Sequence, residues 1–377
     1  MQLCGCYAQS DQPAGLIFDL EIFERHLDML LTPLNLGKTR GMRRLANQTG
    51  HFTTIALDQR PPIAQILAAR RGVAPDQVSF DDMMAAKRVI VETLGPSASA
   101  MLFDPNYALP AAIACLPAHT GLIVTLEDHR FQDTPGGRMS NSIANWNVDK
   151  IKRLGGDGVK VLAWYRPDAA PEVLAHQKAY VKHVGDECRR CDIAYVLELL
   201  TYPFKRLDGK PCPQLPEVQA QNVIDSLREF SKPEYGVDLF KLESPLPGAS
   251  LPETDGSVPH QLALNWFNEM GRICREASVP WVMLSAGVTP EQFLRVMHYA
   301  YAAGANGFLA GRAIWSEALQ CFPDLQACRE VLRVQSLQTL QRLMDLTHRE
   351  GQAWTPSYNG LDQIQVEGDM CNAYTSS

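Results

Sequence analysis

The chain has 377 residues, 46% of them hydrophobic and 20% charged, so it can bury a large core and shows no bias towards a disordered or fibrous protein. Its formal charge of −7 and its pI near 5.7 argue against a general nucleic-acid surface and a polybasic membrane anchor, which both need clustered positive charge. Because no apolar run approaches the roughly 18 residues of a membrane span and the first residues lack a secretory pattern, we expect a cytoplasmic protein without membrane or nucleic-acid partners.

Short apolar runs rich in β-forming residues recur along the chain, and each is followed by a segment long enough for a helix. The eight runs are 53–58, 99–104, 121–127, 158–165, 193–199, 237–243, 280–286 and 306–312. Near-continuous apolar strands that alternate with helices are typical of parallel strands covered by helices. Eight such units predict an α/β fold of the closed (β/α)8 type, a TIM barrel.

The segments between the runs carry apolar residues at three- and four-residue spacings, which predicts an outer ring of helices. The clearest are 177–192, 221–232 and 290–304, and Thr289 is the expected N-cap of the last. We expect a single barrel domain over 35–350, with 1–34 as an N-terminal extension and 351–377 as a C-terminal tail. The polar insertion 251–260, after the sixth strand, is either part of a site rim or a plain surface loop.

Ten cysteines are scattered along the chain and do not resemble a disulfide scaffold, so reduced thiols are expected. Cys188 and Cys191 have CxxC spacing, but no second CxxC or HxxxH accompanies them. Ordinary thiols are therefore favoured over a zinc or redox site.

Catalytic groups in such barrels lie at the C-terminal ends of the strands, so polar residues there are informative. Lys241 stands among apolar residues in the sixth run, where burial and neighbouring cations would lower its pKa and free the amine for a Schiff base with a ketone. Lys160 in the fourth run is the rival amine, and repulsion between the two would depress at least one pKa. An ion pair of Lys241 with Glu198 or Glu243, or a side chain that reaches solvent, stays open as a structural alternative.

Two carboxylates are the candidates for proton transfer. Glu198, in an otherwise apolar fifth run, suits a general acid/base whose pKa is raised by desolvation, or else it neutralises a lysine. Asp58, directly after the first run, is open between proton transfer, hydroxyl binding and pairing with Arg60. Asp104, Glu127 and Asp128 also follow strands, and the sequence assigns them no role.

The last two strands predict a phosphate site. Ser285 and Gly287 follow the seventh strand, and Gly311 and Arg312 follow the eighth. Glycines let backbone N–H groups approach an anion, and an arginine can meet two phosphate oxygens at once. Loops seven and eight commonly bind phosphate in this architecture, although glycines also serve tight turns.

Several stretches together resemble the tagatose 1,6-bisphosphate aldolase family, which are class I aldolases of the (β/α)8 type. The matching stretches, in order, are LDQR at 57–60, FDPNYALPA at 103–111, DGVKVLAWY at 157–165, LELLTY at 197–202, FKLESP at 240–245, LSAGV at 284–288 and AGRAIW at 310–315. They span about residues 50–320, a range that includes all eight expected strands, and their ordered agreement is more specific than any single motif.

The resemblance implies a role for each candidate residue. Lys241 would be the Schiff-base lysine and Glu198 the acid/base, with Lys160 and Asp58 as polar partners. Ser285, Gly287, Gly311 and Arg312 would hold the phosphate next to the ketone, and Gln59 and Arg60 would reach the distal anionic group. The implied reaction is the reversible cleavage of a tagatose- or fructose-type ketohexose 1,6-bisphosphate to dihydroxyacetone phosphate and glyceraldehyde 3-phosphate. The resemblance also implies relaxed discrimination among ketohexose bisphosphate epimers and a reaction that needs no metal and no cofactor.

Some features depart from the family, and alternatives remain. Pro61 and Pro62 stand where members often have glycine, and the third loop, 127–141, is unfamiliar. A related branch acts on sulfofructose 1-phosphate, so the distal anion is open between phosphate and sulfonate. A zinc-dependent aldolase is disfavoured because the nine histidines show no obvious metal pair. A sugar-phosphate sensor without catalysis is disfavoured by the presence of Lys241 and Glu198. Assembly into a homo-oligomer is left open.

Overall fold

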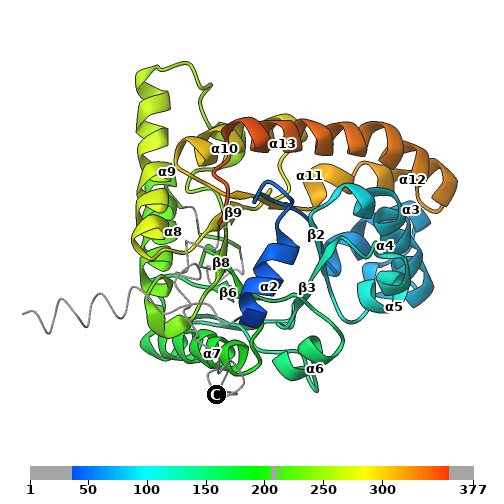
Figure 1. The fold of residues 1–377 in the computed structure, drawn as a ribbon, viewed down its shortest axis with the longest axis horizontal. Helices are drawn as coiled ribbons and strands as arrows, with labels where there is room; N and C mark the ends of the chain where they lie inside the picture. Colours follow the sequence, from blue (N-terminus) through cyan, green and yellow to red (C-terminus); the bar gives the residue numbers. More distant parts are fainter. Residues whose placement is uncertain (1–35, 205–209, 213, 356–377) are drawn as a thin grey trace, which may run out of the picture.

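The computed structural model describes residues 36–204, 210–212 and 214–355. Eight parallel strands close into a barrel in the order β1-β2-β3-β6-β7-β8-β9-β10, and β10 pairs again with β1 (Figure 1). They are β1 (Phe52–Leu57), β2 (Ala100–Phe103), β3 (Gly121–Thr125), β6 (Gly158–Trp164), β7 (Ala194–Leu200), β8 (Leu239–Leu242), β9 (Trp281–Met283) and β10 (Gly307–Ala310). The predicted (β/α)8 barrel is confirmed, and every predicted run overlaps one of these strands.

Helices cover the outside of the strands, as the three- and four-residue spacings predict. The longer ones are α3 (Pro61–Arg71), α4 (Phe80–Leu94), α7 (Pro171–Arg190), α8 (Pro216–Phe230), α9 (Val258–Glu276), α10 (Pro290–Ala302) and α13 (Leu337–Glu350). The short ones are α5 (Ala108–Ala112), α6 (Val148–Arg153), α11 (Arg312–Trp315) and α12 (Leu325–Val331). Thr289 caps α10 through a hydrogen bond from the Gln292 N–H, as expected from its sequence.

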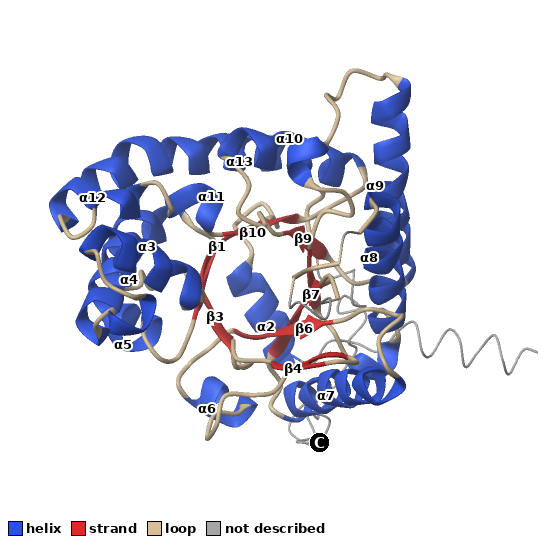
Figure 2. Cartoon of the chain, turned by 180° about the vertical axis from the view of Figure 1, so that it is seen from behind, coloured by secondary structure: helices blue, strands red, loops and turns tan. Residues whose placement is uncertain are grey.

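A further helix, α2 (Leu36–Leu45), lies across one end of the ring of strands (Figure 2). Its Met42 and Leu45 join a buried cluster with residues of the strands, such as Ala56 and Val196. The ion pair between Lys38 Nζ and Asp238 Oδ2, 2.7 Å apart, ties α2 to the residue before β8. Since this end carries the start of each strand, α2 closes the floor of the barrel and leaves the C-terminal ends as its mouth.

The ends of the chain were predicted as extensions. Residues 1–34 and 356–377 lie outside the described residues. Within the described part, Trp354 belongs to the buried cluster that contains Met42 and Leu45, and its backbone N–H donates a hydrogen bond to the Gly50 carbonyl oxygen. The chain therefore still packs on the barrel four residues beyond the end of α13.

Two further observations bear on the sequence predictions. Among the described residues, no helix combines the length and the apolar character needed to cross a bilayer. Cys188 lies buried within α7 and Cys191 directly follows that helix, and both are free thiols. Burial raises the pKa of both thiols, which disfavours the thiolate that metal binding and redox chemistry require.

Candidate active site

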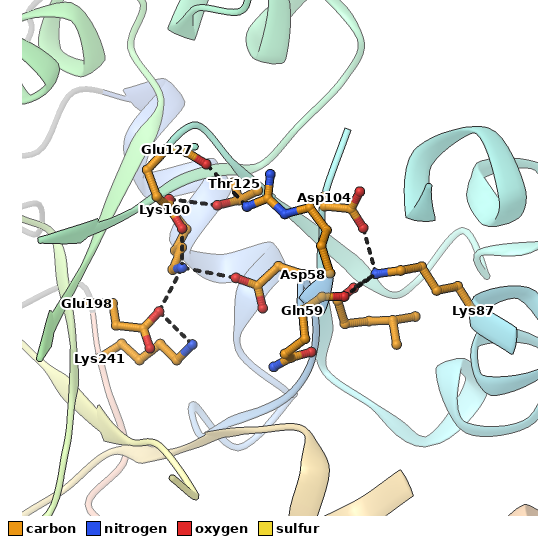
Figure 3. A network of polar contacts seen from close by, with 11 residues as sticks. Asp58, Gln59, Lys87, Asp104, Thr125, Glu127, Lys160, Glu198 and Lys241 are labelled. Atoms are coloured by element: carbon orange, nitrogen blue, oxygen red, sulfur yellow. Dashed lines mark hydrogen bonds and ion pairs between the residues drawn. The ribbon is translucent and has the colours of Figure 1, made fainter. Parts of the chain in front are cut away.

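The mouth of the barrel holds a charged cluster centred on Lys160 of β6 (Figure 3). Its Nζ lies 2.6 Å from Glu127 Oε1, 2.7 Å from Glu198 Oε2 and 2.9 Å from Asp58 Oδ2. The three carboxylates come from β7 and from the segments that directly follow β1 and β3. They therefore converge on one ammonium, which joins four of the eight strand ends.

Lys241 of β8 lies beside this cluster. The register pairs Glu198 with Lys241 on neighbouring strands, which brings Lys241 Nζ within 2.9 Å of Glu198 Oε2. The ion pair that the sequence left as a structural alternative is thus present, and its partner is Glu198. Glu243 instead accepts a hydrogen bond from the Thr201 N–H at 2.5 Å. The two lysines differ in their partners, because Lys160 contacts three carboxylates and Lys241 contacts one.

The electrostatics of the cluster correct the expectation for Glu198 and bear on that for Lys160. Burial alone would raise the pKa of Glu198, but Lys160 and Lys241 outweigh burial and lower it. Glu198 is therefore held as a carboxylate, whereas desolvation was expected to raise its pKa. Burial would likewise lower the pKa of Lys160, yet its carboxylate partners hold the pKa well above its usual value. Repulsion between the two lysines does not free the amine of Lys160.

Asp58 is strongly ionised as well. Burial disfavours its charged form, but Lys160 and Lys241 overcome this cost and bring the pKa well below the usual range for a carboxyl group. The structure pairs Asp58 with Lys160, a partner that was not among the alternatives left open for it. Arg60 donates from Nη2 to the Glu127 carbonyl oxygen, at 3.3 Å.

One pocket of about 240 Å³ opens on the cluster and unites seven of the ten predicted site residues. Its lining includes Asp58, Gln59, Arg60, Lys160, Glu198, Lys241 and Arg312. Arg60 Nε and Gln59 Oε1 are buried and have no hydrogen-bond partner among the described residues, which leaves them available to a bound ligand.

The other three predicted residues lie in the loops that follow β9 and β10. Gly287 has φ +82°, which favours glycine, and a Cβ there would lie 2.8 Å from the guanidinium carbon of Arg312 and would displace the arginine side chain. A Cβ on Gly311 would lie 2.6 Å from the Ala56 carbonyl oxygen. Ser285 is buried two residues before Gly287. In the described part of the chain, Arg312 forms no ion pair, so its charge is available to an anion.

The structure adds residues that the sequence did not single out. Glu127 was noted only as the end of a strand, but it contacts Lys160 and also accepts a hydrogen bond from Thr125 Oγ1 at 2.6 Å. The signal was the same as for Glu198, a carboxylate that ends an apolar run. Ser140, Leu162 and Trp164 also line the pocket.

The unfamiliar third loop forms a hairpin at the rim of the mouth. Strands β4 (Gln132–Thr134) and β5 (Gly137–Met139) pair antiparallel. The guanidinium of Arg138 lies 4.5 Å from the ring centres of Phe131 and Trp164 and 4.8 Å from that of Tyr202. These cation–π contacts hold the hairpin against Trp164, a wall of the pocket.

A second pocket, of about 540 Å³, adjoins the first and shares Arg60, Pro61, Asp128 and His129 with it. Arg130 and Tyr107 are among its other lining residues. The two pockets therefore meet at Arg60. No group of three or more His, Cys, Asp or Glu side chains is placed to hold a metal ion within the described ranges.

Replacing Lys160 by Met tests the central ion cluster. The variant leaves Asp58, Glu127 and Glu198 with one cation fewer, and breaking a buried pair in this way costs roughly 3 to 5 kcal/mol of unfolding free energy. In the wild type, Asp58 and Glu198 have lowered pKa values, so their stabilisation is present above the pKa of the unfolded chain and is lost as the pH falls through the folded pKa.

Without Lys160 these carboxyls can protonate at higher pH. Urea unfolding should therefore show a large difference between wild type and Lys160→Met at pH 7 that shrinks towards about pH 4. Lys182→Met, in an exposed pair with Asp186, is the control. An equal difference at both pH values would contradict the assigned charge states.

Comparison with known proteins shows that this chain is similar to aldolases over most of its length. Residues 55–317 match the model of the DeoC/LacD family aldolases. Tagatose 1,6-diphosphate aldolase of Listeria monocytogenes serotype 4a is 30% identical over 344 residues, which cover 89% of this chain and 99% of the relative. Tagatose 1,6-diphosphate aldolase 2 of Enterococcus faecalis is 30% identical over 331 residues, or 85% and 96% of the two chains.

Solved structures agree on the fold. A fructose-bisphosphate aldolase from Plasmodium falciparum aligns with a TM-score of 0.60 and 14% identity, over 86% of this chain and 99% of that chain. One from Slackia heliotrinireducens gives a TM-score of 0.52 and 13% identity, over 89% and 93%. The eight-stranded barrel is shared with both. From the family match and the identity to its relatives, this chain belongs to the DeoC/LacD family and is an aldolase.

Proposed function

We propose that the protein is a class I aldolase that reversibly cleaves a ketohexose 1,6-bisphosphate of the tagatose or fructose type, through a Schiff base on Lys241. The observation that carries this proposal is the unequal pairing of two buried lysines. Lys160 is fully engaged by three carboxylates, whereas Lys241 lines the pocket with a single partner, Glu198. The relatives named for tagatose 1,6-diphosphate support the substrate class.

The two pockets support the way in which the substrate is placed. Arg312, with Gly287 packed on it, suits the phosphate next to the ketone, and it lines the same pocket as Lys241. The distal half of the sugar then points towards Arg60, whose unpartnered Nε lies where the second pocket begins. When both anionic groups of the substrate are bound, its ketone is held next to the amine of Lys241. Binding at the two ends of the substrate thus aligns the reacting atoms at its centre.

In the proposed reaction, Lys241 gives up a proton and its amine attacks C2 of the open-chain ketose. The C2 oxygen takes up that proton and one from the nitrogen and leaves as water, which gives a cationic imine. The Glu198 carboxylate takes the proton of the C4 hydroxyl. The C3–C4 bond breaks, its electron pair moves into the imine, and glyceraldehyde 3-phosphate leaves. A proton then adds to C3 of the neutral enamine, and water releases dihydroxyacetone phosphate and restores the lysine.

The low pKa of Glu198 fits this sequence. A carboxylate held by two cations is a weak base in the resting site, but bond cleavage turns the positive imine into a neutral enamine. Glu198 loses one of its two cationic neighbours at that step, which raises its affinity for a proton at the moment the C4 hydroxyl gives one up. Lys160 keeps Glu198 in place throughout.

We also propose a cytoplasmic location, because doubly charged sugars do not cross bilayers.

The substrate class is tested by comparing the cleavage of tagatose 1,6-bisphosphate, fructose 1,6-bisphosphate and sulfofructose 1-phosphate under matched conditions. We expect both bisphosphates to be cleaved with kcat/KM values within about tenfold of each other, because Asp58 and Glu198 both line the pocket and each offers an acceptor to a C4 hydroxyl. A clear preference for the sulfonate would reassign the distal anion. Tight binding of all three without cleavage would favour a sensor instead.

The nucleophile is tested by borohydride reduction in the presence of substrate, followed by peptide mass spectrometry. The stable adduct should lie on Lys241, because Lys160 is held as a salt-bridged ammonium. Lys241→Met should give neither adduct nor cleavage, and Lys182→Met is the surface control. An adduct on Lys160, or normal cleavage by Lys241→Met, would contradict the assignment.

Glu198→Gln tests proton transfer. Imine trapping on Lys241 should persist, while kcat should fall by about 10²- to 10⁴-fold, the usual contribution of a general acid/base. Glu217→Gln, an exposed carboxylate at the start of α8, serves as the matched control. Unchanged turnover in Glu198→Gln would remove Glu198 from this role.

A further inference from the structure

A third buried lysine lies at the mouth of the barrel, outside the charged cluster. Lys87 projects from α4, and its side chain is fully buried. Its Nζ donates to the carbonyl oxygens of Leu57 at 2.6 Å and Gln59 at 2.9 Å, and to Asp104 Oδ2 at 2.7 Å (Figure 3). An ammonium has three N–H groups, and here each has one acceptor. Lys87 therefore has no donor left for a substrate, and its role has to be sought in what it holds.

The two carbonyl groups flank Asp58. The ladder between β1 and β2 ends at the pair Leu57–Phe103, and β2 gives way to a turn at Asp104. Buried carbonyl oxygens beyond this point would lack a strand partner, which is costly. The ammonium of Lys87 supplies the missing donors. It therefore satisfies backbone acceptors in the segment directly after β1, which carries predicted site side chains.

Asp104 anchors the lysine. Its Oδ1 accepts hydrogen bonds from the N–H groups of Asn106 at 2.9 Å and Tyr107 at 2.8 Å, and its Oδ2 accepts from Ala108 N–H at 3.3 Å. These bonds tie the carboxylate to the turn that leads into α5. The position of Lys87 is thus set by α4 and by the loop after β2, two elements that do not contribute to the cluster around Lys160.

We propose that Lys87, anchored by Asp104, is a positioning residue for the reaction. It fixes the backbone on both sides of Asp58, and so sets the contact of Asp58 with Lys160 at 2.9 Å and the direction of Gln59 and Arg60 into the pocket. Lys160 also contacts Glu198, and Glu198 contacts Lys241, so the position of Asp58 influences the positions of both residues. This inference deepens the proposed function and rests on it for the kinetic readout alone.

The chain offers a matched control at the floor of the barrel. Lys38 and Asp238 form a buried pair with the same 2.7 Å separation, and Asp238 also accepts a hydrogen bond from a backbone N–H, that of Tyr195. Lys38→Met therefore removes a comparable buried ammonium far from the mouth. A general loss of stability would appear in both variants, whereas a loss of positioning would appear only in Lys87→Met.

The experiment compares kcat and KM of wild type, Lys87→Met and Lys38→Met, together with borohydride trapping. We expect kcat of Lys87→Met to fall at least about tenfold, more than KM changes, since a displacement of about 1 Å at a reacting group can cost 10²-fold in rate. Trapping on Lys241 should persist, and Lys38→Met should keep kcat within about twofold. Equal kinetic constants in the two variants would overturn the proposal. Asp104→Asn, which keeps the side-chain volume, should behave like Lys87→Met and replaces it if that variant does not fold.

A second readout does not depend on the substrate. Amide hydrogen exchange followed by mass spectrometry should show faster exchange over residues 55–62 in Lys87→Met and no change there in Lys38→Met. If the wild-type enzyme cleaves none of the ketose phosphates, the proposed function has failed and this readout alone decides on the positioning role. Equal protection of residues 55–62 in wild type and Lys87→Met would then overturn it.

Discussion

The convergence of three carboxylates on the ammonium of Lys160 is the interaction on which the rest of the site depends. Burying Asp58, Glu127 and Glu198 together is unfavourable without a cation between them, because each charge loses its hydration and repels the others. With Lys160 in place, the ends of four strands are held at hydrogen-bond distance from one atom. Glu198 is then fixed beside Lys241, which gives the pocket its arrangement of a base next to an amine.

The unequal division of carboxylates also separates two lysines that look equivalent in the sequence. Both stand in apolar strands, and both face the same pocket. Lys160 is stabilised as a cation by three partners, so losing its proton would leave an uncompensated cluster of negative charge. Lys241 shares its one partner with Lys160, and exchanging its ammonium for a cationic imine leaves the charge of the site unchanged. This difference supports the proposal of covalent chemistry at residue 241.

The fold followed from the sequence because continuous apolar runs and helical spacings are local signals. The site followed in part, since Asp58, Lys160, Glu198 and Lys241 stand at strand ends that a closed barrel must bring together. The role of Glu127 was not assigned, although it ends an apolar run as Glu198 does, because its contact with Lys160 depends on a distance that the sequence does not give. The direction of the Glu198 pKa did not follow either, because burial and two cations act in opposite senses and distances decide which prevails. Lys87 looked like any polar residue in a helix.

The barrel places buried lysine–aspartate pairs at both of its ends, and the position of each pair decides its consequence. At the floor, Lys38 and Asp238 join α2 to the start of a strand, below an apolar layer that includes Leu102 and Val196. Because that layer separates the floor from the pocket, we expect a disturbance at the floor to lower stability without reaching the reacting groups. At the mouth, Lys87 holds the backbone of the same segment that carries Asp58, with no apolar layer between them. A buried lysine–aspartate pair therefore stabilises the fold at the floor, whereas at the mouth it also sets the catalytic geometry.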